Sequence, residues 1–291
     1  MTMDIDPVQE TLYNVRNRVP NFLDLFQGWS QRSAAFRDHA SAQFDIRYDD
    51  TPKGTMDLFK PTEVEDGTLL PLHIFIHGGY WQAMDKADFS YIAEQFVQNG
   101  IAVLIVNYDL CPDVTLDHIV EQMRAVVTWA WEKGDTYGLD PHNIHISGHS
   151  AGGHLVGELL TTDWQSRGEH PVHPSVIKSA ISLSGLFDLT PLVQTTINTN
   201  VGLSATTAQT RSPMGKPCHI NCPVLCAYGG LEGEGFEMQS AKAVEHFTAQ
   251  GLEAELVKLE NATHFDAVDA LADPHSVVFQ WALSHIKKVK G

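Results

Sequence analysis

A serine between two glycines is the clearest nucleophile in the chain. The apolar segment 143–147 runs directly into Gly148-His149-Ser150-Ala151-Gly152, a G-x-S-x-G sequence. A serine on a sharp turn between a strand and a helix needs small residues two positions before and after it, because larger side chains would crowd the turn. The motif by itself is common. In this setting it predicts Ser150 as the nucleophile of an acyl-transfer enzyme.

A second glycine motif precedes it in the chain. Residues 72–76 read as a buried strand, and His77-Gly78-Gly79-Tyr80-Trp81 follows directly. The tetrahedral intermediate of acyl transfer carries a negative oxygen, and each fixed N–H donor around that oxygen contributes roughly a hundredfold to a thousandfold in rate. In α/β-hydrolases one donor follows the nucleophile and another comes from the loop after the third strand. We therefore expect the amides of Gly78, Gly79 and Ala151 to form the oxyanion hole.

A serine hydroxyl also needs a base, which in this chain order comes last, after an orienting carboxylate. The chain has 15 histidines, so position must choose among them. His264 lies just beyond the final predicted strand, 254–259, and is the expected base. His285, in the predicted terminal helix, is the weaker alternative.

The carboxylate is expected just past the preceding strand, 223–228. Glu232 comes first there and is the predicted acid, with Glu234 as the alternative. Aspartate is commoner at this position, so a glutamate requires a slightly different backbone distance. Asp266, beside the predicted base, is assigned to loop structure.

Three further histidines lie near the nucleophile or the glycine pair in sequence: His77, His149 and His154. We expect each to be structural, with the His149 side chain directed away from the site.

Aromatic residues flank these motifs and predict the walls of a substrate pocket. Tyr80 and Trp81 extend from the oxyanion loop, and Phe187 and Phe265 follow later strands. Such rings would suit an aromatic leaving group.

The elements that would position these residues alternate between strands and helices from residue 72 onward, which is typical of βαβ units and a doubly wound, mainly parallel sheet. An antiparallel edge is expected from two earlier strands. The expected strands are 43–48, 55–60, 72–77, 101–106, 143–148, 177–184, 223–228 and 254–259, and the expected helices are 86–99, 116–133, 151–162, 236–250 and 274–288.

No linker, repeat or low-complexity run divides the chain, so residues 1–291 are expected to form one domain. Two segments fall outside the alternation of strands and helices: 8–38, which reads as helical, and 185–215. We expect them to cover the site and exclude water from it.

Taken together, the motifs resemble those of the α/β-hydrolases of the hormone-sensitive-lipase type, and among them the arylformamidases. The resemblance implies an α/β-hydrolase fold, no metal or organic cofactor, and hydrolysis of N-formylkynurenine or a related aryl amide; the alternative is a carboxylesterase of short-chain acyl esters. It extends over nearly the whole chain, through residues 13–16, 19–20, 48, 57–59, 77–81, 85–89, 107–108, 148–155, 232–240 and 261–266.

Composition limits the partners. The net charge of −17 repels nucleic acid and anionic membrane surfaces, and no signal peptide or long apolar stretch is evident, which predicts a cytoplasmic protein. Cys218, Cys222 and Cys226 are spaced like metal ligands, but Cys226 falls within a predicted strand, and buried, reduced thiols are expected instead. The expected partner is a small amide or ester, and a homodimer is left open.

Overall fold

The computed structural model describes residues 4–167 and 171–289, and within these ranges a single sheet of eight strands runs through the molecule. Its spatial order is β1-β2-β4-β3-β5-β6-β7-β8. The strands are β1 (Ala42–Arg47), β2 (Thr55–Phe59), β3 (Leu70–Ile76), β4 (Ala102–Val106), β5 (Leu139–His149), β6 (Ile177–Leu183), β7 (Val224–Gly229) and β8 (Ala254–Leu259).

From β4 to β8 all neighbouring strands are parallel, whereas β1 pairs with β2, and β2 with β4, in antiparallel fashion. The predicted α/β-hydrolase sheet and its antiparallel edge are therefore confirmed. The central strands are almost continuously apolar because both of their faces are covered.

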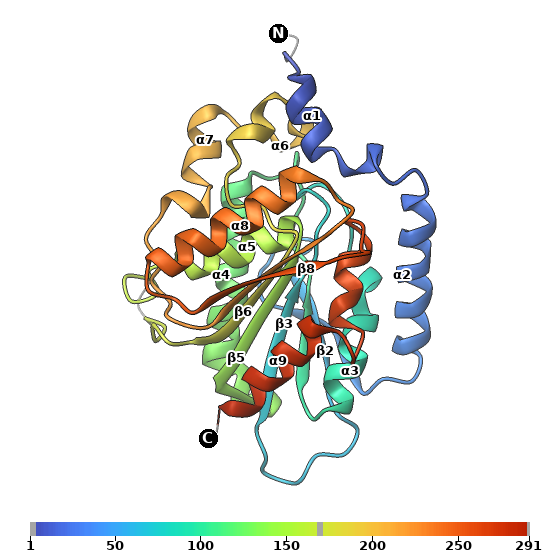
Figure 1. Ribbon diagram of the computed structural model, residues 1–291. Helices are drawn as coiled ribbons and strands as arrows, with labels where there is room; N and C mark the ends of the chain where they lie inside the picture. Colours follow the sequence, from blue (N-terminus) through green and yellow to red (C-terminus); the bar gives the residue numbers. More distant parts are fainter. Residues whose placement is uncertain (1–3, 168–170, 290–291) are drawn as a thin grey trace.

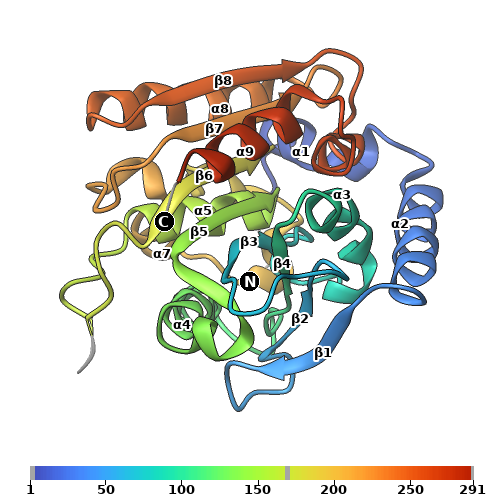
Figure 2. The same cartoon turned by 90° about the horizontal axis from the view of Figure 1, so that it is seen from below.

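Helices cover both faces of the sheet (Figures 1 and 2). Crossovers after β4, β5 and β7 move along the sheet in one direction, and the crossover after β3 moves in the other, so right-handed connections place their helices on opposite faces. One face carries α4 (Leu116–Lys133), α5 (Ala151–Leu160) and α8 (Glu234–Ala249), and the other carries η2 (Lys86–Ile92), α3 (Ala93–Gln98) and α9 (Val277–Lys288). Short turns η3 (Gly134–Tyr137) and η6 (Asp266–Leu271) complete these connections.

The two segments outside the alternation of strands and helices form helices of 3 to 16 residues. In Figure 1, α1 (Pro7–Tyr13) lies beside α6 (Asn198–Val201), and α2 (Phe22–Arg37) runs along the side of the molecule, where it packs against η2. The first segment contains α1 (Pro7–Tyr13), η1 (Val15–Asn17) and α2 (Phe22–Arg37); the second contains η4 (Thr190–Gln194), α6 (Asn198–Val201), α7 (Ala205–Thr210) and η5 (Pro213–Gly215).

Several histidines are buried inside the sheet and its flanking helices. His73 on β3 pairs in register with His145 on β5. His73 stacks on the Phe96 ring at 4.2 Å, and its Nε2 lies 2.7 Å from the Ser147 hydroxyl. Burial lowers the pKa of His73 to about 3. Burial likewise lowers the pKa values of His149 and His154, to about 3 and about 4.

These histidines should make the protein labile to mild acid. In the unfolded chain a histidine takes up a proton near pH 6.5, but in the folded protein these three stay neutral to about pH 4, so the unfolded state binds more protons and stability falls as pH falls. Between pH 7 and pH 5 we expect each to lower the free energy of unfolding by about 2 kcal/mol. Urea titrations at the two pH values would measure the loss.

His73→Gln should reduce the loss of unfolding free energy between pH 7 and pH 5, even if it lowers the stability at pH 7. Replacement of the exposed His275 by asparagine is the matched control and should leave the slope as it is. Equal stability of the wild-type protein at pH 7 and pH 5 would contradict the expectation.

Candidate active site

Ser150 stands on the sharp turn between β5 and α5. Its backbone has φ of 56° and ψ of −116°, a conformation that L-residues rarely adopt, and its amide donates to the carbonyl of Leu183 on β6 at 2.8 Å. The flanking glycines permit this turn. A Cβ on Gly148 would lie 2.2 Å from the carbonyl oxygen of Gly152, and one on Gly152 would lie 2.0 Å from that of Ile76. The predicted need for small residues on both sides of the serine therefore has a direct steric cause.

His264 and Glu232 form a hydrogen-bonded chain with Ser150. The His264 Nε2 lies 3.0 Å from the Ser150 Oγ, and its Nδ1 lies 2.6 Å from the Glu232 Oε2. All three residues are buried. The chain order and the strand ends from which these residues come are those expected from the sequence: after β5, β7 and β8.

The carboxylate of Glu232 is held from its other side as well. Its Oε1 accepts from the Ser184 hydroxyl at 2.7 Å and from the Gly229 amide. Glu234, the alternative acid, is exposed at the start of α8 and makes no contact of this kind. The sequence reasoning missed Ser184, which follows β6. Its only signal was a small polar residue at the carboxyl end of a parallel strand.

The three amides expected to form an oxyanion hole are free to donate. Within the described residues, no backbone or side-chain acceptor is hydrogen-bonded to the N–H of Gly78, Gly79 or Ala151. Ala151 is the first residue of α5, where amides have no acceptor inside the helix. The main chain of Gly78 lies against the nucleophile, because a Cβ there would be 3.1 Å from the Cβ of Ser150.

The loop that carries the two glycines is held in an unusual backbone conformation. Gly79 has φ of 107°, and the non-glycine residues Tyr80, Trp81 and Met84 also have positive φ. A Cβ on Gly79 would lie 2.3 Å from the Ala83 carbonyl oxygen, so only glycine fits there. The Cys111 amide donates to the Trp81 carbonyl at 2.8 Å and ties the loop to the chain after β4. Backbone conformations of this kind cost of order 1–3 kcal/mol each and are typical of functional loops.

His149 is oriented differently from the expectation. Its ring lines the cavity beside Ser150 instead of pointing away, and its Nε2 lies 2.8 Å from the carbonyl oxygen of His264. The prediction failed because the sharp turn at Ser150 brings the preceding side chain toward the loop after β8. Burial, and then the nearby His264, lower the pKa of His149, so the ring is neutral and donates from Nε2. It thereby fixes the backbone of His264. His285, the alternative base, instead contacts the Trp281 carbonyl within α9.

A largely apolar cavity opens at Ser150 and His264. Tyr80 and Phe265 line it, as expected. The N-terminal segment supplies much of the remaining wall, so part of residues 8–38 lies over the site, as expected. The other apolar side chains in the wall are Val15, Phe26, Trp29, Met84 and Phe89.

Trp81 and Phe187 do not line this cavity, contrary to expectation. The left-handed backbone at Trp81 turns its ring toward α5, where it packs edge-on against the His154 ring at 5.0 Å. Phe187 is buried against Phe247 of α8 at 5.7 Å. Both rings belong to the core that supports the site.

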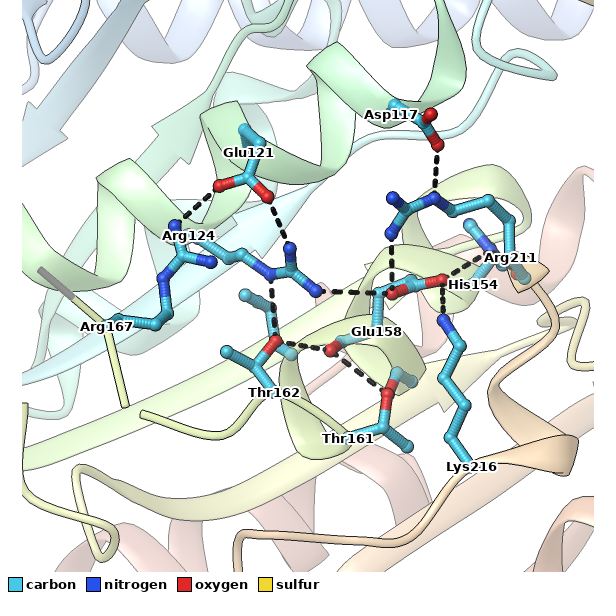
Figure 3. Close-up of polar contacts among 12 residues, drawn as sticks. Asp117, Glu121, Arg124, His154, Glu158, Thr161, Thr162, Arg167, Arg211 and Lys216 are labelled. Atoms are coloured by element: carbon cyan, nitrogen blue, oxygen red, sulfur yellow. Dashed lines mark hydrogen bonds and ion pairs between the residues drawn. The ribbon is translucent and has the colours of Figure 1, made fainter. Parts of the chain in front are cut away.

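A buried carboxylate lies one helical turn beyond His154. The side chain of Glu158 on α5 is 1% exposed and attracts three cations (Figure 3). Lys216 Nζ lies 2.5 Å away, and the guanidinium groups of Arg124 and Arg211 lie 3.7 Å and 3.6 Å away. Because Arg211 and Lys216 belong to the second covering segment and its continuation, Glu158 joins that segment to the helix that begins at Ser150.

No group of three or more His, Cys, Asp or Glu side chains in the described ranges is arranged to hold a metal ion. The four cysteines are free thiols in the structure, and burial raises the pKa of Cys222 and Cys226 to about 12. No helix of the described part is long and apolar enough to cross a membrane.

Comparison with known proteins adds to this geometry. The BD-FAE family model matches residues 56–220. Kynurenine formamidase of Salmo salar is 31% identical over 246 residues, which cover 81% of this chain and 79% of the relative. The isoprenylcysteine alpha-carbonyl methylesterase of Arabidopsis thaliana is 26% identical, over 86% of this chain and 62% of that enzyme.

A solved structure from Silicibacter sp. TM1040, carrying a provisional thioesterase label, superposes with a TM-score of 0.79 at 29% identity, covering 95% of this chain and 97% of the other. The relatives named above are hydrolases, and so is this chain. Its sequence similarity and its eight-stranded fold together show that the protein belongs to the BD-FAE family and is an arylformamidase-like α/β-hydrolase.

Proposed function

We propose that the protein hydrolyses its substrate by acyl transfer through Ser150. His264 removes the hydroxyl proton as the oxygen attacks the acyl carbon, and Glu232 orients the imidazole and stabilises its charged form. The amides of Gly78, Gly79 and Ala151 hold the oxyanion. His264 then protonates the leaving atom, which leaves the acyl group on Ser150. To release it, His264 takes a proton from water as the water attacks the acyl carbon, and returns that proton to the Ser150 oxygen. No step needs a metal or an organic cofactor.

The observation that carries the proposal is the continuous chain from Ser150 Oγ through His264 to Glu232, with distances of 3.0 Å and 2.6 Å. The unpaired amides beside the same hydroxyl supply the remaining part of the mechanism.

The substrate that we propose is an N-formyl aryl amine such as N-formylkynurenine, which would place the enzyme in tryptophan catabolism in the cytoplasm. The kynurenine formamidase of Salmo salar supports this assignment by its name and its similarity. The cavity supports it by its chemistry, because its aromatic and apolar walls suit an aromatic leaving group.

A carboxylesterase of short acyl esters is the second proposal. It is favoured by the similarity to the methylesterase of Arabidopsis thaliana. Esters have better leaving groups than amides, so the same residues would cleave them.

A comparison of kcat/KM values would separate the two functions. We expect N-formylkynurenine to exceed 4-nitrophenyl acetate and 4-nitrophenyl butyrate in kcat/KM by at least about tenfold, since a fitted aryl formamide uses binding energy that the small esters lack. The released formate and kynurenine would be measured directly. A preference for the esters by orders of magnitude would favour the esterase.

A further inference from the structure

A second, polar cavity adjoins the one that contains Ser150. The two cavities share Arg16 and Tyr80 as wall residues. The second cavity is lined by seven of the described residues. Apart from Ile197, its other lining residues all carry amide or hydroxyl groups: Asn14, Gln82, Thr196 and Asn200. A ligand that is apolar at one end and polar at the other would fit across this pair of cavities.

Arg16 is placed to bind an anion at the boundary. It contributes the only permanently charged side chain among the described residues that line the cavity at Ser150. Its guanidinium lies over the Phe22 ring at 5.7 Å, and within residues 4–167 and 171–289 no carboxylate comes within 4.0 Å of it. The side chain is exposed. Its hydrogen-bonding capacity is therefore available to a ligand.

The polar wall opposite Arg16 is fixed by its own hydrogen bonds. The Glu10 carboxylate accepts from the Asn14 amide at 2.7 Å, and from the Thr196 hydroxyl at 2.6 Å. On the other side, Asn200 donates to Gln82 at 2.8 Å, and Gln82 donates to the Ile197 carbonyl at 3.3 Å. Binding there would require little further ordering of these side chains, which favours affinity.

We propose that Arg16 and this polar cavity form a subsite for an anionic tail on the leaving group, so that the preferred substrates are aryl amides whose ring bears a short chain ending in a carboxylate. The aryl ring lies in the apolar cavity with its acyl carbon at Ser150, and the carboxylate pairs with the Arg16 guanidinium, whose planar fork matches it. The chain has a net charge of −17, so an anionic substrate needs such a local cation. The inference rests on the proposed acyl transfer at Ser150 and adds to it the residue and the cavity that select the charged tail.

The test compares two substrates with the same scissile bond, N-formylkynurenine and formanilide, which lacks the tail. Arg16→Met should lower kcat/KM for N-formylkynurenine at least about tenfold more than for formanilide, mainly through KM, because a hydrogen-bonded charge pair is lost. Arg16→Lys should restore part of the difference. In the wild-type protein, KM for N-formylkynurenine should rise with ionic strength while KM for formanilide stays constant.

Arg18→Met is the matched control. It removes a positive charge from the same loop, but its guanidinium donates to the Thr11 carbonyl and does not line either cavity. Equal losses for the two substrates in Arg16→Met, or equal selectivity losses in Arg16→Met and Arg18→Met, would overturn the subsite.

A second substrate pair makes the result independent of the formamidase assignment. Phenyl acetate and 3-(2-acetoxyphenyl)propanoate differ by the anionic tail on an ester leaving group. If the wild-type protein prefers esters, the formamidase assignment fails. Arg16→Met must still lower kcat/KM more for the ester that carries the anionic tail than for phenyl acetate. Calorimetric titration of Ser150→Ala with N-formylkynurenine, with and without Arg16→Met, measures binding without turnover, and equal affinities there would also overturn the subsite.

Discussion

Replacing Ser150 with alanine is expected to lower kcat/KM by about four to six orders of magnitude, for amide and ester substrates alike. The hydroxyl that lies 3.0 Å from His264 would be lost, and no other described serine or threonine hydroxyl lies within hydrogen-bonding distance of that nitrogen. The residual rate would come from the free amides and from substrate binding. Steady-state kinetics, with formate release as the readout for amides, measures the loss. The free energy of unfolding should stay near that of the wild-type protein.

Variants of His264 and Glu232 test whether these two residues and Ser150 act together in catalysis or contribute independently. His264→Ala should cost about as much as Ser150→Ala, and the double variant should lose little more, because residues that act as a unit are non-additive. Glu232→Gln should lose about four orders of magnitude, since an amide cannot hold the imidazole in the required state.

Ser182→Ala is the matched control for the nucleophile. Ser182 is a buried serine on β6 in register with Gly148, and its hydroxyl has no hydrogen-bond partner among the described residues. It should retain activity within a few-fold of the wild-type value. A Ser150→Ala protein that keeps more than about one per cent of the wild-type kcat/KM would contradict the mechanism.

Among the proposed substitutions, the largest effect on stability is expected at Glu158. Glu158→Gln should lower the free energy of unfolding by about 3–5 kcal/mol, because removing one partner of a buried ion pair leaves the others buried without compensation. Arg124 and Arg211 have second partners in Glu121 and Asp117 (Figure 3). Lys216 has no second carboxylate within 4.0 Å in the described part of the chain, so most of the cost falls on it. Urea unfolding at pH 7 measures the change.

A double-mutant cycle tests this explanation. Lys216→Met and Glu158→Gln together should destabilise the protein by clearly less than the sum of the single variants, because each removes the interaction that the other needs. Glu121→Gln is the control within the same cluster. Its carboxylate is 51% exposed, so its two arginine contacts should contribute about 1 kcal/mol or less. Strict additivity of the cycle would rule out the pairing as the cause.

Much of the fold and of the proposed triad could be predicted from the sequence. The apolar strands alternate with longer amphipathic helices, and in a parallel sheet the carboxyl ends of the strands gather at one edge. Ser150, Glu232 and His264 each follow such a strand, so their order along the chain was enough to predict that they meet. The need for glycine at 148 and 152 could also be predicted, and it has two causes: the end of β5 lies against the start of α5 at Gly148, and α5 lies against the end of β3 at Gly152.

Side-chain direction could not be predicted in the same way. Trp81 and His149 lie within the two glycine motifs, yet the direction of their rings depends on the positive φ values at Trp81 and Ser150, which the motifs do not reveal. Phe187 was equally ambiguous, since an aromatic residue after a strand suits a core or a cavity wall. Glu158 left no clear signal, because the three cations that surround it come from distant parts of the chain.

The origin of the cavity walls has an evolutionary consequence. The family match spans residues 56–220, which include the nucleophile and the glycine pair, whereas Val15, Arg16, Phe26, Trp29 and Phe265 lie outside it. The part of the cavity wall formed by residues 15–29 is thus encoded apart from the nucleophile and from the proposed base and acid. Mutations in the codons for these residues would reshape the wall while leaving Ser150, His264 and Glu232 in place.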